Sequence, residues 1–276
     1  MGISKSKATS YLLDQTHFET SYTLLTPLGE GGFGTIYTIR SNQTCTEHVV
    51  KSIKRKGVPM ERLHSTGEKV PREVKITAGL QHPNIIKLLD FYTLRKNYLL
   101  ILEYHAGWVD LFDFTAKKRR MEEDSSKKIM TQVLSTLTYL HTELSVAHLD
   151  IKPENILLNP ADLSVKLLDF GAANYITPGK PMDKFEGTRQ YAAPDILFRG
   201  SFDPVHADIW ASGVTLYRLV VGDLPFHCPE DYYDMLRFPS RISVYCQHVL
   251  CLMLCRQSEL RPGSVEEVLR APFFSL

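Results

Sequence analysis

The sequence predicts an α+β protein built of two lobes. Residues 22–104 contain apolar, β-branched segments of strand length, whereas long segments after residue 105 carry apolar residues at spacings of three and four. A chain of 276 residues is long enough to bury the cores of two lobes. We therefore expect a small antiparallel β-lobe over 21–104 and a larger, mainly helical lobe over 105–276, with a ligand site in the cleft between them.

Strands are expected in the first lobe at YTLLTPL, TIYTIR and EHVVKSI, and the continuous apolar run NYLLILEY indicates a buried strand. PREVKITAGL predicts the one helix of this lobe, with Pro71 at its start and Gly79 near its end. The polar segment 58–67, which contains Pro59 and Gly67, is expected to be a loop.

Three helices are expected in the second lobe, at DSSKKIMTQVLSTLTYLHTEL, ADIWASGVTLYRLVVG and SVYCQHVLCLMLC. Cys251 and Cys255 lie one helical turn apart in the last of these, in apolar surroundings. This placement favours core packing over a zinc site, because no second pair of ligands is visible.

The composition limits which kinds of partner and which cellular compartment are expected. The net charge of +1 provides no bulk field for nucleic acid, so we expect no nucleic-acid partner. Five scattered cysteines, an odd number, favour a reduced, cytoplasmic setting. No apolar stretch approaches the ~20 residues that span a bilayer.

Residues 1–20 show no strong periodicity and are expected to form a flexible N-terminal segment. The start MGISKSK fits the pattern for N-myristoylation, with Gly2 and Ser6 correctly spaced and Lys5 and Lys7 adding positive charge. The alternative is that Gly2 matches by chance. If Gly2 is modified, we expect weak, reversible membrane association of part of an otherwise cytoplasmic protein.

One polar run, HLDIKPEN, supplies four chemically distinctive side chains: His148, Asp150, Lys152 and Asn155. A DFG triplet follows at 169–171, and upstream lie the glycine loop GEGGFG and a lysine in a short apolar run. Each motif is weak alone, but their order and spacing match the protein-kinase signature. Over roughly residues 22–274 the chain resembles a eukaryotic-type serine/threonine protein kinase, and the resemblance implies the bilobal protein-kinase fold, ATP and Mg²⁺ as cofactors, and protein substrates.

The resemblance implies that the glycine loop covers the phosphates of ATP, because glycines let the backbone approach a ligand closely. The ATP-binding residues that it implies in the first lobe and at its boundary with the second are Leu28, Gly29, Glu30, Gly31, Gly32, Phe33, Gly34, Ile36, Val49, Lys51, Glu73, Leu102, Glu103 and His105. Leu102 would be the gatekeeper, and the hinge from Glu103 to His105 would bind the adenine. Asp110 and Leu157 complete the set from the second lobe, although Asp110 could equally cap the helix that follows it.

Two of these assignments have rivals. Lys51 stands 17 residues after Gly34 and would hold the α- and β-phosphates, whereas Lys54 fits the strand pattern less well. Glu73, ten residues before Pro83 on the expected helix, would pair with Lys51. Glu68 is the alternative partner.

In the second lobe the resemblance implies that Asp150 orients or accepts the proton of the substrate hydroxyl. Lys152 would meet the γ-phosphate, and Asn155 and Asp169 would hold Mg²⁺ through oxygen ligands. The substrate pocket would include Thr188 and Glu154. Lysine at position 152 and the run GTRQYAAPD are similar to serine/threonine kinases and not to tyrosine kinases. Asp208 would brace the backbone of the catalytic loop, and we expect a monomer.

The chain departs from the family pattern at four positions. Leu149 replaces the arginine that usually binds an activation-loop phosphate, so we expect activity without phosphorylation of that loop. Val49 replaces alanine at the adenine site, and Thr77 occupies a position that is normally apolar. Asp195 replaces a glutamate, so its bridge to Arg261 is expected to be strained or water-mediated. Val49 and Thr77 are the features that favour the alternative, a catalytically weak or dead scaffold.

Two further segments bear on specificity. GDLPF and DLFDF are most similar to the Pim and calcium/calmodulin-dependent kinases. In kinases that select arginine upstream of the acceptor, two acids commonly receive it. Glu154 supplies the first acid here, but Arg218 stands at the position of the second. We therefore expect a weakened preference for arginine two residues upstream.

Overall fold

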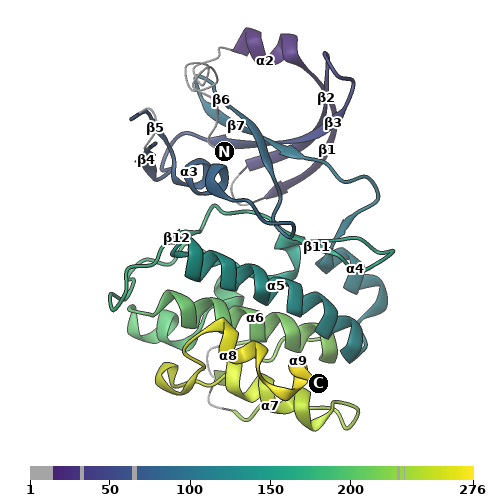
Figure 1. Ribbon diagram of the computed structural model, residues 1–276, viewed down its shortest axis with the longest axis vertical. Helices are drawn as coiled ribbons and strands as arrows, with labels where there is room; N and C mark the ends of the chain where they lie inside the picture. The colour runs from purple at the N-terminus through teal and green to yellow at the C-terminus, as the bar shows by residue number, and fades with distance from the viewer. Residues whose placement is uncertain (1–14, 32–33, 64–66, 229–230, 233) are drawn as a thin grey trace. The chain divides into compact units, whose positions relative to one another are not determined.

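The computed structural model describes residues 15–31, 34–63, 67–228, 231–232 and 234–276. They form two compact units (Figure 1). The first unit comprises the described residues up to Gln81 together with Ile86–Ala106, and the second comprises His82–Ile85 and Gly107–Leu276. The predicted α+β class is confirmed. The expected boundary at 104/105 lies two residues too early and missed the segment His82–Ile85, which belongs to the second unit.

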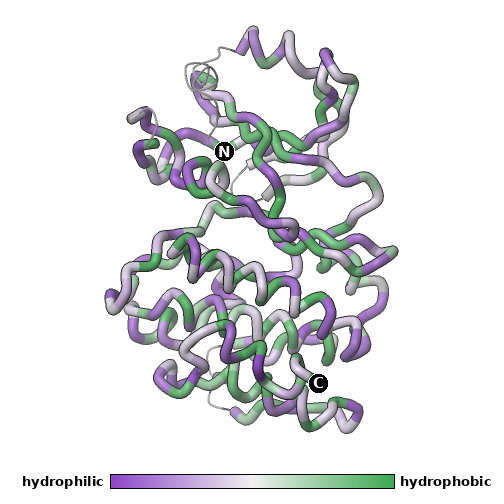
Figure 2. The backbone as a smooth tube through the Cα atoms, in the orientation of Figure 1, coloured by the Kyte–Doolittle hydropathy of each residue, from purple (hydrophilic) through white to green (hydrophobic). Residues whose placement is uncertain are grey.

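The first unit is built on an antiparallel sheet of five strands in the order β1-β2-β3-β7-β6. These strands are β1 (Tyr22–Gly31), β2 (Gly34–Ser41), β3 (Glu47–Lys54), β6 (Leu88–Thr93) and β7 (Asn97–Glu103). β7 is apolar along most of its length (Figure 2) because it is buried on both faces. Tyr98 and Leu100 enter one apolar cluster, whereas Leu99 and Ile101 enter another on the opposite face.

Helix α3 (Arg72–Gly79) packs through Val74 against one face of this sheet. Beside it, β4 (Met60–Arg62) pairs with β5 (Lys69–Pro71). The expectation of a loop over 58–67 was therefore wrong for residues 60–62. A polar composition conceals the strand because it is stabilised by backbone pairing, Met60 opposite Pro71, and not by apolar burial.

A short helix, α2 (Gln15–Ser21), contributes to the other face of the sheet. Its Phe18 ring meets Tyr92 edge-on at a centroid distance of 5.5 Å and Tyr22 at 5.6 Å. The flexible segment expected over 1–20 was therefore wrong for residues 15–20, because one aromatic anchor orders the helix without any periodic pattern. Gly2, Lys5 and Lys7 lie outside the described residues.

The second unit is mainly helical. Its α-helices are α4 (Leu111–Lys118), α5 (Glu123–Glu143), α6 (Pro204–Val221), α7 (Val244–Met253), α8 (Val265–Leu269) and α9 (Pro272–Ser275). Its short strands are β8 (Val109–Asp110), β9 (Val146–Ala147), β10 (Ile156–Leu158), β11 (Val165–Leu167) and β12 (Asn174–Tyr175). Single turns occur at η1 (Pro153–Asn155), η2 (Arg189–Tyr191), η3 (Asp195–Arg199) and η5 (Ser258–Leu260).

Helix α5 matches its prediction to within one residue at each end, and its stripe of Ile129, Val133, Leu137 and Leu140 is buried. Helix α6 has an N-cap residue, Asp203, whose side chain accepts hydrogen bonds from the backbone N–H groups of Val205 and His206. It is apolar nearly all round and almost entirely buried. It therefore supplies a rigid support for the loops packed against it.

The expectation that Cys251 packs in the core was wrong, as the orientation of helix α7 shows. The buried face of the helix is formed by Cys246, Val249, Leu250 and Met253, at spacings of three and four. Cys251 lies on the opposite face and is exposed, and Cys255 beyond the helix end is only partly buried. Continuous hydrophobicity in the sequence concealed which side of the helix packs inward.

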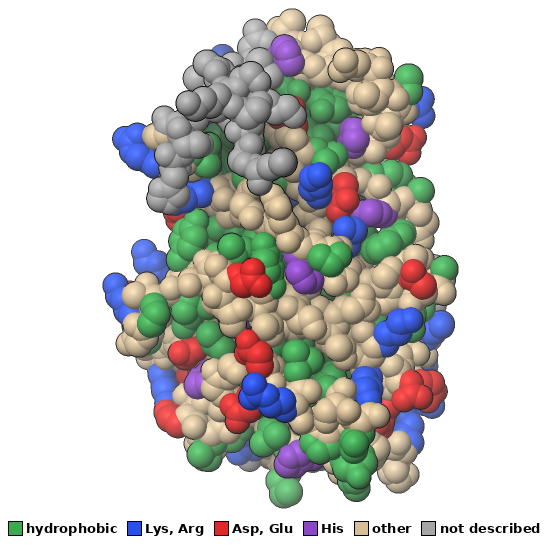
Figure 3. All heavy atoms as spheres, in the orientation of Figure 1, with side chains coloured by type: hydrophobic (Ala, Val, Ile, Leu, Met, Phe, Trp, Pro, Cys, Tyr) green, Lys and Arg blue, Asp and Glu red, His purple; other side chains and the backbone are tan. Residues whose placement is uncertain are grey.

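The described helices include none that is long and apolar enough to cross a membrane. On the face drawn in Figure 3, acidic and basic side chains are interspersed across the described surface. This mixture agrees with a net charge close to zero.

Candidate active site

Lys51 and Glu73 form a buried ion pair within the first unit. Lys51 Nζ lies 2.8 Å from Glu73 Oε1, and the two side chains are 7% and 9% exposed. Lys51 lies at the centre of the sheet, opposite Ile36 on β2 and Leu100 on β7, whereas Lys54 at the end of β3 is exposed. An ammonium fixed by a buried carboxylate is pre-oriented to receive an anion.

The glycine loop joins β1 to β2, with Gly29 opposite Ile36, Glu30 opposite Thr35 and Gly31 opposite Gly34. Gly34 has φ of +148°, and a Cβ there would meet the backbone oxygen of Ser52 at 1.6 Å. No other residue fits at this position. Gly32 and Phe33, two of the predicted phosphate contacts, lie outside the described residues.

The residues expected around the adenine belong partly to this sheet. Ile36 and Val49 are half-buried and Leu28 is 53% exposed. Val49 lies opposite Leu102, whose side chain packs against the cluster beneath α3. Glu103 is tied to Lys87 by a reciprocal pair of hydrogen bonds, both at 3.0 Å, and the same carboxylate lies 3.3 Å from His105 Nε2. The strand end that leads into the expected hinge is thereby fixed.

The central feature of the second unit is the Asp150 carboxylate, which is 4% exposed. Its Oδ1 accepts a hydrogen bond from Thr188 N at 2.8 Å, and its Oδ2 accepts one from Asn155 Nδ2 at 2.8 Å. Lys152 Nζ lies 2.9 Å from Asp150 Oδ2 and donates to Thr188 Oγ1 at 2.6 Å. Burial raises the pKa of Asp150, but the hydrogen bonds from Thr188 and Lys152 and the charge of Lys152 outweigh it, so the net shift is downward. The carboxylate is therefore held ionised.

The loop that carries Asp150 is supported from below by Asp208 on α6. The Asp208 carboxylate accepts hydrogen bonds from His148 N at 2.8 Å and Leu149 N at 2.7 Å. The bracing role predicted for Asp208 agrees with these bonds. Sequence reasoning missed His141 of α5, whose Nε2 lies 2.8 Å from the same carboxylate. A lone histidine at a helix end carries no signal of such a partner 67 residues away.

His148 connects this loop to the DFG segment. Its Nδ1 accepts from Asp150 N at 3.2 Å, so the proton lies on Nε2, which donates to the Leu168 carbonyl at 2.9 Å. The imidazole also meets the ring of Phe170 edge-on at 4.9 Å. Asp169 follows with φ of +56°, and its Oδ1 accepts from Gly171 N at 3.0 Å.

Asn155 and Asp169 are the residues predicted to hold Mg²⁺. Asn155 donates through Nδ2 to both the carbonyl and the carboxylate of Asp150, at 2.8 Å each, which leaves its side-chain oxygen outside these bonds. That oxygen and the Asp169 carboxylate are hard ligands. One or two protein ligands, supplemented by phosphate and water, suit Mg²⁺, so the donor set fits this ion.

Asp110 caps α4, since its Oδ1 accepts from Asp113 N at 2.7 Å. The capping alternative is thus confirmed, while a ribose contact stays a prediction. Burial raises the pKa of Asp110, although hydrogen bonds from the backbone oppose the shift. Leu157 lies directly opposite Asp110 in the β8–β10 pair, and Glu154 is exposed on η1.

Leu149 is buried in an apolar cluster that sequence reasoning missed. The cluster comprises Ala147, Leu149, Ala172, Phe202 and Ala207, and Ile176, Met182, Phe185 and Ile196 pack against it. Several of these belong to the segment between DFG and Thr188. That segment is also pinned by backbone bonds, from Ile176 N to Ser145 O at 2.6 Å and in both directions between Met182 and Phe202. The side chain at position 149 therefore contacts this segment through apolar atoms.

Arg261 contacts Asp195 directly, and both side chains are buried. The direct contact shows that the expectation of a water-mediated bridge was wrong, whereas the alternative, a strained bridge, stays a prediction. The Arg261 guanidinium also stacks 5.0 Å from the Trp210 ring centre and donates through Nε to the Cys255 carbonyl at 2.7 Å.

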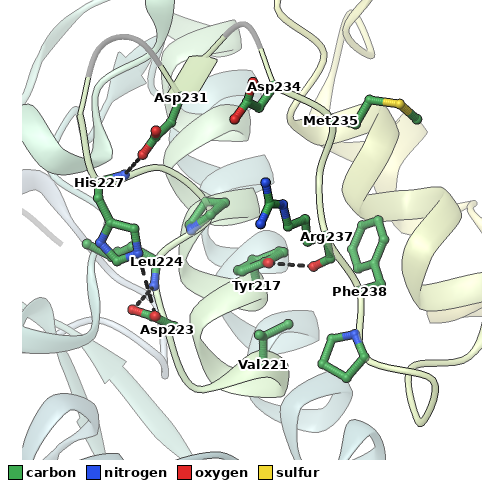
Figure 4. A pocket seen from close by; sticks show the side chains of 12 residues that line it. Tyr217, Val221, Asp223, Leu224, His227, Asp231, Asp234, Met235, Arg237 and Phe238 are labelled. Atoms are coloured by element: carbon green, nitrogen blue, oxygen red, sulfur yellow. Dashed lines mark hydrogen bonds and ion pairs between the residues drawn. The ribbon is translucent and has the colours of Figure 1, made fainter.

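A cavity of about 510 Å³ lies elsewhere in the second unit, beyond the C-terminal end of α6 (Figure 4). The Arg237 guanidinium points into it, and Tyr217 Oη donates to the Arg237 carbonyl at 2.6 Å. Its described lining does not include Asp150, Lys152, Asn155 or Asp169. It is therefore not where the chemistry of these residues takes place.

Comparison with known proteins agrees with this geometry. The family described as protein kinase domain matches residues 22–274. Two mouse (Mus musculus) proteins, sperm motility kinase 3A and sperm motility kinase 3B, are each 31% identical to the chain over 276 residues. The alignments cover 98% of this chain and 53% of each relative, so the chain spans about half the length of these curated relatives.

Proposed function

Because this chain belongs to the protein kinase family, and is a protein kinase that uses ATP, we propose that it phosphorylates serine and threonine hydroxyls with the help of Mg²⁺. One observation carries the choice of acceptor: Lys152 bridges the Asp150 carboxylate and the Thr188 hydroxyl, while Thr188 N bonds to the other carboxylate oxygen. The backbone at 187–188 passes directly beside the carboxylate. A substrate chain lying against it brings a short side chain, and not a tyrosine ring, within reach.

The residues of each unit have distinct roles in this proposal. The ion pair with Glu73 orients Lys51 towards the α- and β-phosphates. Asp150, held ionised, orients the acceptor hydroxyl and accepts its proton, and Lys152 offsets charge on the γ-phosphoryl group. Asn155 and Asp169 would hold Mg²⁺, which supplies further charge neutralisation when bound.

Acceptor specificity is tested with peptides that differ only in the acceptor: serine, threonine, tyrosine or alanine. We expect transfer to serine and threonine and at least about tenfold less to tyrosine, which corresponds to about 1.4 kcal/mol in the barrier. The alanine peptide reports background. Equal transfer to tyrosine would contradict the assignment.

We further propose that the segment from DFG to Thr188 adopts its active arrangement without phosphorylation. Burial of Leu149 among Ile176, Met182 and Phe185 supports this, because an apolar cluster needs no phosphate to form. Gly187 contributes as well. A Cβ at that position would meet the Leu149 carbonyl at 2.1 Å, so the two backbones pack closely.

Protein made in bacteria, treated with phosphatase and shown by mass spectrometry to carry no phosphate is expected to keep most of its activity. The double variant Tyr175→Phe/Thr177→Ala removes the two hydroxyl side chains between Gly171 and Thr188 that could accept a phosphate, and it should behave in the same way. A tenfold or greater loss of kinase activity, which corresponds to about 1.4 kcal/mol in the barrier, would show that a cationic side chain binds a phosphate on this segment.

For localisation we propose a cytoplasmic protein with a minor membrane-bound fraction, supported by the N-terminal pattern around Gly2. One acyl chain gives marginal binding, and Lys5 and Lys7 add ~1 kcal/mol each near an anionic surface. Gly2→Ala should move the protein wholly to the soluble fraction, with kinase activity unchanged. An unmodified N-terminus, measured by intact mass after expression in a eukaryotic host, would end this proposal.

A further inference from the structure

Arg218 of α6 is a cation that the transfer chemistry does not use, although it lies close to the catalytic carboxylate. Its Nη1 donates to Tyr191 Oη at 3.2 Å. Tyr191 N in turn donates to the Thr188 carbonyl at 3.0 Å, and Thr188 N donates to Asp150 Oδ1 at 2.8 Å. Arg218 therefore contacts the side chain of a residue whose backbone is hydrogen-bonded to Thr188, the residue that bonds to Asp150.

The electrostatics of the Tyr191 phenol agree with this proximity. Burial raises its pKa to about 12, the charge of Glu154 adds to the increase, and the charge and hydrogen bond of Arg218 oppose it. The Asp150 carboxylate makes a smaller contribution in the same direction as Glu154. Arg218, Glu154 and Asp150 thus all lie within electrostatic range of one hydroxyl.

Arg218 is held in a way that leaves it able to bind. Its guanidinium carbon lies 4.7 Å from the centre of the Phe112 ring, so the aromatic ring supports the group. Only Nη1 has a hydrogen-bond acceptor among the described residues, and within that part of the chain Arg218 forms no ion pair. A stacked guanidinium with unused donors is suited to bind a carboxylate or phosphate through two parallel hydrogen bonds.

Glu154 is the competing charge. It is exposed on η1, where water and salt screen it, whereas Arg218 is half-buried against Phe112 and Tyr191. At the Tyr191 hydroxyl the charge of Glu154 acts more strongly than that of Arg218, so anion binding by Arg218 depends on direct hydrogen bonds from its guanidinium and not on the net local charge.

We infer that Arg218, supported by Phe112 and Tyr191, forms a subsite for a negatively charged side chain of the protein substrate, close to the acceptor hydroxyl. The inference rests on the proposed kinase function and names a class of substrate for it. The group bound would be an anion with two or three oxygens. Aspartate or glutamate supplies it as a carboxylate, and a residue phosphorylated beforehand supplies it as a phosphate.

The test is a positional peptide library with serine acceptors, in which each flanking position carries alanine, arginine, glutamate or phosphoserine in turn. We expect one position at which glutamate, phosphoserine or both raise kcat/KM about tenfold over alanine. Arg218→Gln should reduce this ratio to near one, and Arg218→Glu should favour arginine at the same position. Arg40→Gln, which removes an exposed arginine of the first unit, is the matched control and should keep the wild-type ratio.

Glu154→Gln tests the charge that opposes Arg218. Because it removes a negative charge near the subsite, it should strengthen the selection for anions. Enrichment of glutamate identifies the carboxylate source, and enrichment of phosphoserine alone identifies a primed substrate. A flat profile for an active enzyme, selection for arginine, or an anion preference that survives Arg218→Gln would overturn the inference. If no serine peptide in the library is phosphorylated, the proposed function itself fails and the inference with it.

Discussion

Asp150→Asn is expected to slow phosphoryl transfer by about 10²–10⁴-fold, the range that a positioned general base contributes. The buried carboxylate receives hydrogen bonds from Thr188, Asn155 and Lys152, and its lowered pKa keeps it ionised. An asparagine side chain has the same size but one acceptor oxygen, and it cannot accept the substrate proton. Single-turnover transfer to a serine peptide, with ATP saturating, measures the loss directly.

Nucleotide binding provides the control for Asp150→Asn. Thermal stabilisation by Mg²⁺ and ATP should persist in this variant, whereas Asp169→Ala should lose it, because Asp169 is the predicted metal ligand. Transfer by Asp150→Asn within threefold of wild type would remove Asp150 from the chemistry. It would also favour the scaffold alternative if wild-type transfer proved equally slow.

Lys51→Met should abolish measurable transfer, whereas the matched change Lys54→Met should leave it near the wild-type level. Lys51 is buried in its pair with Glu73, and Lys54 is exposed three residues later on the same strand. Removing one partner of a buried ion pair also destabilises a protein by about 3–5 kcal/mol, because the other charge stays buried. Denaturant unfolding and transfer assays on both variants check the two effects.

A double variant separates folding from chemistry at this pair. Lys51→Met/Glu73→Gln removes both charges and should recover much of the stability lost in Lys51→Met, without recovering transfer. Recovery of transfer together with stability would show that Lys51 is only structural. Equal losses from the two lysine changes would show that the wrong lysine had been assigned to the phosphates.

Local patterns explain how much of the fold was predictable. Helix α5 carries six buried apolar residues along one face, and β7 carries a continuous apolar run, so both elements could be predicted from the sequence. Helix α2 and strand β4 do not, because one is anchored by the single ring of Phe18 and the other by pairing with β5. In each case the stabilising partner lies outside the short stretch of consecutive residues from which an element is predicted.

The same distinction holds for the candidate site. The segment 148–155 could be recognised because its polar side chains lie close together in the chain, and the bonds among Asp150, Lys152 and Asn155 are correspondingly local. The partners of Leu149 could not, since Ala172, Ile176 and Phe202 are apolar residues that any core could use. Leucine in place of the usual arginine at position 149 indicated that a contact to a phosphate was absent. It did not indicate which residues Leu149 contacts instead.

The apolar packing of Leu149 has a consequence for how such an enzyme could be controlled. If this segment adopts its active arrangement without phosphorylation, as proposed, its packing through buried methyl groups and an aromatic ring should respond weakly to salt and not at all to a phosphatase. On the proposed function, the signal that this kinase delivers is set by how many copies of the protein exist and where they are held. On that proposal, the rates of synthesis and degradation and the location of the protein would control its activity in the cell, and the total activity would be proportional to the amount of protein.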